Sequence, residues 1–291
     1  MVASLSFTAI FVPFKDRGNR SRAPFDSLSV FRCVYMIRPL LSLALLLLYC
    51  SPLHAQDGAV AGGDANSQIL QILKTMPQGG GYSATAGATR DLQSAVQVYG
   101  GTLNVKPAAA RSTYCSGATY LVFIQAIQRS IPRSEVGGGL AEALAIKGQP
   151  DGVGVWGRWN ANGPGTACLF SELRLGHNFT SFDEAKPGDF MKIFWTDAVG
   201  AREHGHSVIY MGRKSVNGIE TVSFWSSNKP LGYGYKEVPR SRISHAIFSR
   251  LETPSNITGF VRLERKNGYL ASLVTSESSL REALDRSGIT R

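Results

Sequence analysis

The spacing of apolar residues predicts helices in the first half of the chain. Between residues 89 and 99, apolar residues recur every three or four positions, and the glycine pair at 100–101 ends the segment. A longer apolar segment of helical length runs from 115 to 131 and is closed by Pro132. Three further short helices are expected, over 67–75, 139–148 and 275–287, the last capped by Ser279.

The hydrophobic period changes in the second half of the chain. Apolar and β-branched residues now cluster in short runs that are typical of strands, at 189–196, 205–212, 219–226 and 259–265. The sequences "PGD" at 187–189 and "NG" at 217–218 predict turns between these runs. Helices that precede an antiparallel sheet predict the α+β class.

The first 55 residues resemble a secretory signal region rather than mature structure. The apolar run 39–50 follows Arg38 and precedes "LHAQ" at 53–56, which is the pattern of a cleaved signal peptide. The run is too short to span a bilayer comfortably, although an uncut N-terminal anchor stays open as an alternative. Met36 is an alternative start of the protein. This pattern predicts a periplasmic or extracellular protein with no stable membrane span after cleavage.

Charge limits the partners that the chain is expected to bind, and cysteine content limits its disulfide and metal sites. Removal of residues 1–55 leaves 236 residues with 25 of the 31 basic and 19 of the 21 acidic residues, a net charge of +6. The basic residues are scattered, which argues against nucleic acid but is compatible with another anionic partner. Only Cys115 and Cys168 remain, 53 residues apart, so neither a disulfide-dense scaffold nor a cysteine metal pair is expected.

Cys115 stands where the predicted helix 115–131 begins. Unpaired N–H groups and the positive dipole end at a helix N-terminus stabilise a thiolate. A nucleophile also needs a base, and His206 opens the apolar strand "HSVIY", with His204 on the same face. Asn228 or Ser227, at the end of the next strand, is expected to orient the imidazole. The sequence therefore suggests cysteine-histidine catalysis.

Three ordered motifs resemble the NlpC-type cell-wall peptidases and the related CHAP amidases. They are "YCSG" at 114–117, "PGD" at 187–189 and "HSVIYMG" at 206–212. The chain departs from that family where Tyr114 replaces the usual aspartate before the cysteine. The resemblance implies a papain-like fold, in which a helix bearing the nucleophilic cysteine packs on an antiparallel sheet.

The same resemblance implies a secreted cysteine peptidase that hydrolyses amide bonds of peptidoglycan peptides without a cofactor. Cys115 is then the nucleophile and His206 the base. The third catalytic residue does not follow a family motif, and Asn228 is expected in this role from its place at the strand end. Four residues are expected to hold the oxyanion or line the substrate cleft: Tyr114, Ser116, Trp156 and Trp159. The implied organisation is a flexible leader (56–87), a catalytic domain (88–265) with a loop-like Gly/Trp-rich insert (149–181), and a tail with a short helix (266–291).

Two alternatives remain open at the level of sequence. One is a non-catalytic wall-binding module, held by a disulfide between Cys115 and Cys168, which an oxidising compartment would permit. The other is a zinc-dependent hydrolase in which His204 and His206 bind the metal with Asp189 or Asp197. Asp189 is otherwise expected to be a turn-forming carboxylate.

Overall fold

A seven-stranded antiparallel sheet organises the computed structural model, which describes residues 64–149 and 151–290. The strand order is β1-β9-β8-β7-β5-β10-β4. Two separate two-stranded ladders pair β2 with β3 and β6 with β11. The strands are β1 (Gly79–Gly80), β2 (Val96–Tyr99), β3 (Thr102–Val105), β4 (Gly176–Phe179), β5 (Phe190–Phe194), β6 (Val199–Gly200), β7 (Gly205–Val216), β8 (Ile219–Asn228), β9 (Gly232–Pro239), β10 (His245–Leu251) and β11 (Glu277–Ser278).

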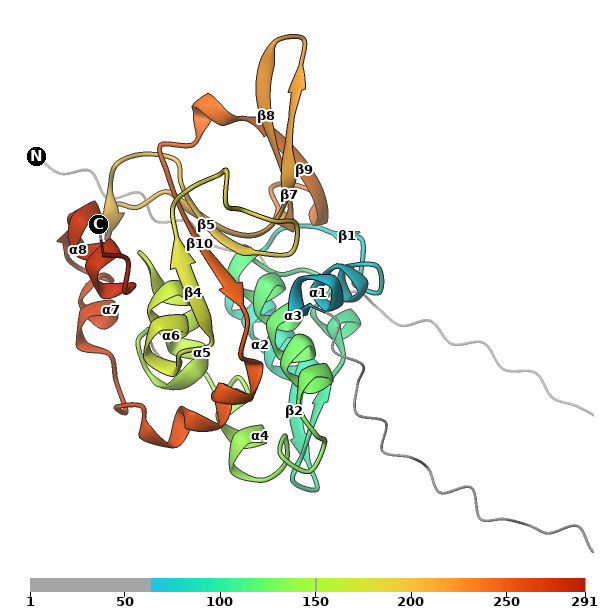
Figure 1. Cartoon of the computed structure of the whole chain (residues 1–291). Coiled ribbons are helices and arrows are strands. Elements are labelled where there is room, and N and C mark those ends of the chain that lie inside the picture. Colours follow the sequence, from blue (N-terminus) through green and yellow to red (C-terminus); the bar gives the residue numbers. More distant parts are fainter. Residues whose placement is uncertain (1–63, 150, 291) are drawn as a thin grey trace, which may run out of the picture. The chain divides into compact units, whose positions relative to one another are not determined.

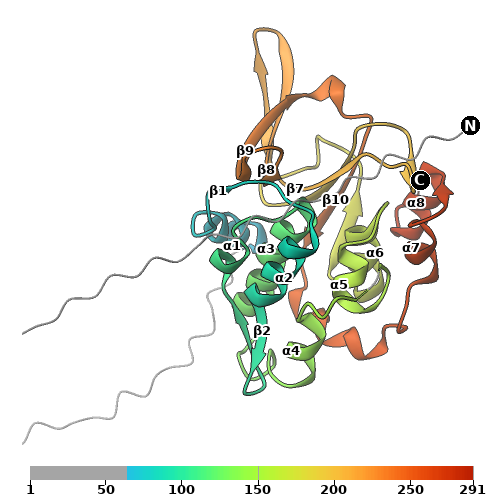
Figure 2. The same cartoon turned by 180° about the vertical axis from the view of Figure 1, so that it is seen from behind.

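Helices α1, α2 and α3 gather on one side of the molecule, and α7 and α8 lie at the opposite end from α1 (Figure 1; Figure 2). The α-helices are α1 (Ala65–Leu73), α2 (Ala86–Ala95), α3 (Cys115–Ser130), α4 (Gly139–Leu144), α5 (Gly154–Trp159), α6 (Gly165–Leu173), α7 (Gly268–Ser272) and α8 (Leu280–Arg286). Three 3-10 helices are η1 (Pro107–Ala110), η2 (Arg240–Arg242) and η3 (Pro254–Arg262). No helix of the described ranges is both long and apolar enough to cross a bilayer.

The sheet separates two hydrophobic cores. Alternate strand residues point to opposite faces, so Ile209 and Trp225 pack in the larger core together with the fully buried residues of α3. Val208 and Phe224 face the other way and form a smaller core with aromatic residues such as Phe248. The far end of the β7–β8 hairpin extends beyond both cores, away from the helices (Figure 1). Helix α3, which begins with Cys115, is thus packed against the sheet in the larger core.

Several sequence predictions are confirmed. Helices form at α3 and α4, three of the predicted strands correspond to β5, β7 and β8, and the described chain is a mixed fold with helices and an antiparallel sheet. The Ser279 hydroxyl caps α8 by accepting the backbone N–H of Glu282. The predicted signal region 1–55, the alternative start Met36 and the leader residues 56–63 lie outside the described residues.

The helix predicted over 67–75 is confirmed as α1, but the prediction that residues 64–87 belong to a flexible leader is wrong. Helix α1 is capped by Asp64, and its Ile69 and Ile72 are fully buried in the larger core. The prediction of a loop-like insert at 149–181 is also wrong, because this segment forms α5, α6 and β4. Its glycines allow close helix contacts instead. A Cβ on Gly165 would lie 2.3 Å from the carbonyl oxygen of Arg158.

One helix boundary and three strands also differ from the prediction. The helix expected over 89–99 ends at Ala95, and Val96–Tyr99 form β2, because the glycine pair at 100–101 turns a hairpin rather than ending a helix. The strand expected over 259–265 is not formed, since residues 254–262 belong to η3. Strands β9 and β10 were not predicted.

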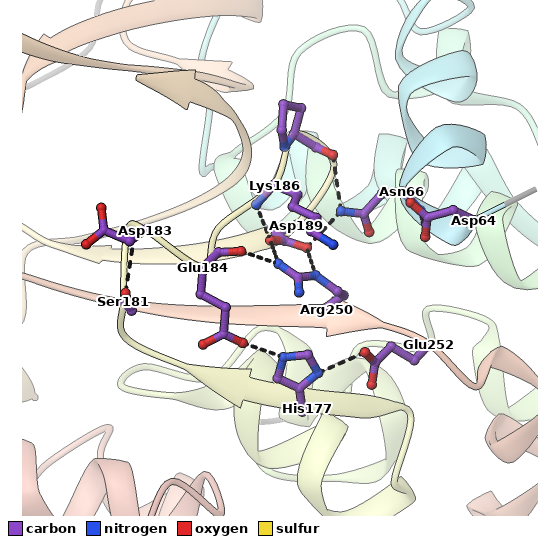
Figure 3. A network of polar contacts seen from close by, with 11 residues as sticks. Asp64, Asn66, His177, Ser181, Asp183, Glu184, Lys186, Asp189, Arg250 and Glu252 are labelled. Atoms are coloured by element: carbon purple, nitrogen blue, oxygen red, sulfur yellow. Dashed lines mark hydrogen bonds and ion pairs between the residues drawn. The ribbon is translucent and has the colours of Figure 1, made fainter. Parts of the chain in front are cut away.

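A buried ion pair fastens α1 to the sheet (Figure 3). Asp189 of the Pro-Gly-Asp turn is fully buried and accepts hydrogen bonds from Arg250 Nε (2.9 Å) and Nη2 (2.8 Å). The same carboxylate accepts from Asn66 Nδ2 in α1 at 2.8 Å and from the backbone N–H of Lys186 at 2.7 Å. Asp189 therefore forms the expected turn and, in addition, joins α1, β5 and β10.

Candidate active site

Cys115 is the first residue of α3, and the N-terminus of this helix is open. Tyr114 occupies the N-cap position in extended conformation and makes no side-chain cap hydrogen bond. The N–H groups of the first turn therefore have no side-chain acceptor at the N-cap and lie beside the partly exposed thiol. Gly117 serves packing here. A Cβ at this position would lie 2.7 Å from the Thr113 hydroxyl and 2.8 Å from Leu92 of α2.

His206 is held between Cys115 and Asn228. Its Nε2 lies 3.0 Å from Asn228 Oδ1. The Asn228 amide nitrogen donates to the carbonyl oxygens of Ser226 (3.2 Å) and Gly234 (2.8 Å), which fixes Oδ1 as the atom that faces the imidazole. Nε2 therefore carries a proton, and the other ring nitrogen, Nδ1, is left for the hydrogen bond with the thiol.

The environment of Cys115 favours the thiolate. Burial raises the pKa of the thiol, but the hydrogen bond to His206 and the charge of that imidazole act in the opposite direction. The backbone N–H of Ser207 and the charge of Lys192 add to this effect, and together these groups lower the pKa of Cys115 to about 6. At neutral pH the cysteine is thus largely ionised, as a nucleophile requires.

Short polar side chains join the start of α3 to β7 and β8, the strands that carry His206 and Asn228, and join these two strands to each other. The Thr119 hydroxyl of α3 lies 2.9 Å from the hydroxyl of Ser207 in β7. On β8, Ser226 donates to the carbonyl oxygen of Ser207, and Ser227 donates to that of Thr113, both at 2.7 Å. Because β7 and β8 are adjacent and antiparallel, the start of one strand meets the end of the other. This arrangement places the imidazole and the amide side by side.

Tyr82 is a site residue that the sequence did not suggest. Burial, followed by the charge of the neighbouring thiol and a hydrogen bond to it, raises the pKa of this tyrosine, and its hydroxyl also interacts with the backbone of Cys115. The segment containing Tyr82 is positioned by β1, and the backbone N–H of Tyr82 donates to the carbonyl oxygen of Pro230 at 3.1 Å. The sequence offers no sign of this residue, because "GGGYSA" is typical of a linker, whereas in the fold the segment pairs with β9 and with Thr113.

The four predicted oxyanion or cleft residues have different surroundings. Ser116 donates to Asn160 Oδ1 at 2.7 Å and lines a cavity with Cys115. Trp159 is 2% exposed, and its indole nitrogen donates to the carbonyl oxygen of Ser116. It therefore stabilises the first turn of α3 from within the core. Trp156 lies in the core against Tyr120 and lines neither cavity beside the site, contrary to its expected place in a cleft wall. Tyr114 is half-buried and packs on Trp156.

Two cavities flank the cysteine and histidine. One, of about 160 Å³, is lined by Cys115 and by the buried ion pair between Lys192 and Glu203. The other, of about 350 Å³, is lined by His206 and Tyr82 but not by Cys115. Gly205, the residue before His206, lines both cavities. Together they can accommodate the two parts of a substrate whose reactive bond lies over the thiol.

The arrangement of the other candidate groups does not match either alternative from the sequence. Cys115 and Cys168 are both free thiols, and Cys168 is buried among Ala161, Leu270 and Leu273. Among the described residues, no three His, Cys, Asp or Glu side chains are placed to hold a metal ion. Asp189 is engaged by Arg250, and Asp197 pairs with His245 rather than with His204 or His206.

Comparisons with known proteins identify no relative of this chain: no family model, curated protein or solved structure matches it.

Proposed function

We propose that this protein is a cysteine amidohydrolase of the papain-like type, and that Cys115, His206 and Asn228 form its catalytic triad. The observation that carries the proposal is the position of His206 at the open N-terminus of α3. Its imidazole lowers the pKa of the Cys115 thiol, and its Nε2 lies 3.0 Å from Asn228 Oδ1. The helix-on-sheet arrangement, with the nucleophile on α3 and the other two residues on neighbouring strands, also supports it.

The reaction follows from the positions of these groups. The Cys115 thiolate attacks the carbonyl carbon of an amide, and the resulting oxyanion accepts hydrogen bonds from the N–H groups at the start of α3 and from the Tyr82 hydroxyl. The protonated His206 then gives its proton to the leaving amine, and the C–N bond breaks. Water, deprotonated by the neutral imidazole, attacks the thioester and releases the carboxylic acid and the thiol.

We further propose that the substrate is a peptide of peptidoglycan and that the enzyme acts in the periplasm or outside the cell. The three ordered motifs and the signal-like N-terminal pattern support this assignment. The net charge of +6 after removal of residues 1–55 agrees with an anionic polymer as partner.

The test is the digestion of purified peptidoglycan by the parental protein and by Cys115→Ala and His206→Ala, with released peptides measured by mass spectrometry. Each substitution is expected to reduce the rate by at least about a thousandfold, because nucleophile and base act as one unit. Cys168→Ala is the matched control, since this thiol is buried away from the site. Digestion at the parental rate by folded Cys115→Ala protein would refute the proposal.

A further inference from the structure

The cavity lined by His206 and Tyr82 carries a concentration of positive charge. Lys229, Lys236 and Arg242 all line it, together with His204, and no aspartate or glutamate does. Within residues 64–149 and 151–290, none of these three cations forms an ion pair with a carboxylate. The cavity is therefore a positively charged recess beside the imidazole.

The three cations come from one part of the sheet, the β8–β9 hairpin and the η2 turn that follows it. Lys236 pairs in register with Phe224, whose ring contacts the His206 imidazole edge-on at 5.6 Å between centroids. Lys229 Nζ lies 5.1 Å above the ring of Tyr82. The charges thus adjoin both the imidazole and the tyrosine that lies beside the thiol.

Other cations of the same sheet are neutralised by carboxylates. Arg213 pairs with Asp183 and Glu220, Lys214 pairs with Glu237, and Arg250 pairs with Asp189. Three unpaired cations around one cavity repel each other, and a bound anion relieves this repulsion while accepting charge-assisted hydrogen bonds. This contrast indicates that the cavity binds a negatively charged group.

We propose that this cavity binds a carboxylate on the leaving-group side of the scissile amide, so that the enzyme selects acidic peptides. The proposal rests on the proposed function and names the substrate class for it. His206 must protonate the leaving amine, so the residue that carries this amine lies next to the imidazole, in the cavity that His206 lines. Trp195 and Val238 line the same cavity and offer apolar surface to the stem of that residue.

The experiment compares two forms of one substrate. A muropeptide that the parental enzyme cleaves is used as isolated and after its free carboxylates have been converted to carboxamides. Both forms are assayed with the parental protein and with Lys236→Gln and Arg242→Gln. Lys229 is left unchanged because it lies over Tyr82. Arg281→Gln is the matched control, since this arginine is 91% exposed on α8 and its loss changes the net charge by the same amount.

For the parental protein and Arg281→Gln, kcat/KM is expected to be about tenfold higher for the carboxylate form, as charge-assisted hydrogen bonds predict. In Lys236→Gln and Arg242→Gln this ratio is expected to fall to about two, mainly through a higher KM for the carboxylate form. A parental ratio near one, or an unchanged ratio in both variants, would overturn the inference and leave the proposed function intact. If the parental protein cleaves no muropeptide in either form, the proposed function itself fails.

Discussion

At the scale of single residues, the reactivity of each cysteine depends on which groups surround its thiol. Cys115 touches His206, the N–H of Ser207 and Tyr82, whereas Cys168 lies in an apolar cluster. Burial is the largest influence on the pKa of both thiols and raises both. Only Cys115 has charged and hydrogen-bonding partners that outweigh this effect, so its neighbours set the direction of its pKa shift.

The pH dependence of alkylation tests this difference. Because the pKa of Cys115 is lowered to about 6, the rate of its reaction with iodoacetamide is expected to rise through pH 6 and to level off above about pH 7. Cys168, whose pKa burial raises to about 12, is expected to stay unmodified in the folded protein. Mass spectrometry of the labelled peptides measures both rates.

His206→Ala provides the comparison for that profile. Loss of the imidazole removes its hydrogen bond and its charge, so the midpoint for Cys115 is expected to move up toward about 8.5, the ordinary value of a thiol. A midpoint that is the same in both proteins would show that His206 does not act on the thiol.

Asn228 is expected to act through the imidazole. Asn228→Ala removes the acceptor that holds Nε2, so kcat is expected to fall by about 10- to 100-fold, part of the usual contribution of general acid–base catalysis. Ser223→Ala is the matched control, because Ser223 lies on the same strand and its hydroxyl donates to Glu237. Steady-state kinetics on the same peptide substrate distinguish the two, and equal kcat values for both variants would exclude this role for Asn228.

At the scale of elements, the Pro-Gly-Asp turn holds α1 against the sheet, a role separate from the proposed catalysis. Gly188 has a φ of +100°, and a Cβ at this position would lie 2.9 Å from Asn66 of α1. The glycine therefore allows α1 to approach the turn, and Asp189 then binds Asn66 and Arg250 (Figure 3). His177, at the surface of the same region, bridges Glu184 and Glu252.

Asp189→Asn is expected to lower the free energy of unfolding by about 3–5 kcal/mol, because it leaves the largely buried Arg250 guanidinium without its counter-charge. Urea denaturation measures the change. Asp183→Asn is the matched control, because Asp183 is 90% exposed and its ion pair with Arg213 is worth less than about 1 kcal/mol. A loss for Asp189→Asn as small as that of the control would contradict the structural role of this ion pair.

At the scale of the whole molecule, stability is expected to be graded from the two cores to the end of the β7–β8 hairpin. Residues 208–210 of β7 are buried and contribute to the two cores, whereas residues 213–220 are all exposed. Amides of the far end of the hairpin are therefore expected to exchange with solvent much faster than those of 206–210 and of α3. Hydrogen exchange followed by mass spectrometry measures this gradient, and equal protection along β7 would contradict it.

The sequence determined the elements whose pattern is local and strong. Helix α3 is a long apolar segment between Tyr114 and Pro132, and β5, β7 and β8 are short apolar runs between turn residues, so propensity and period were sufficient. The sequence also brought Cys115, His206 and Asn228 into one hypothesis, because their motifs occur at the ends of predicted elements, where side chains can meet. In the fold His206 lies beside both Cys115 and Asn228, and the catalytic roles of the three residues stay a prediction.

Only the tertiary structure decided the roles of segments that have weak local signals. The sequence predicted a helix over 67–75 but not its packing: α1 is held by buried Ile72 and by Asp189, and β1 positions Tyr82 beside the thiol. Trp156 lies in the core because it packs against Tyr120, which is distant in the sequence. The cationic cavity likewise arises from residues of β8, β9 and η2 that have no common sequence pattern. The physical reason is the same in each case: these positions are fixed by long-range contacts, which a local hydrophobic period does not record.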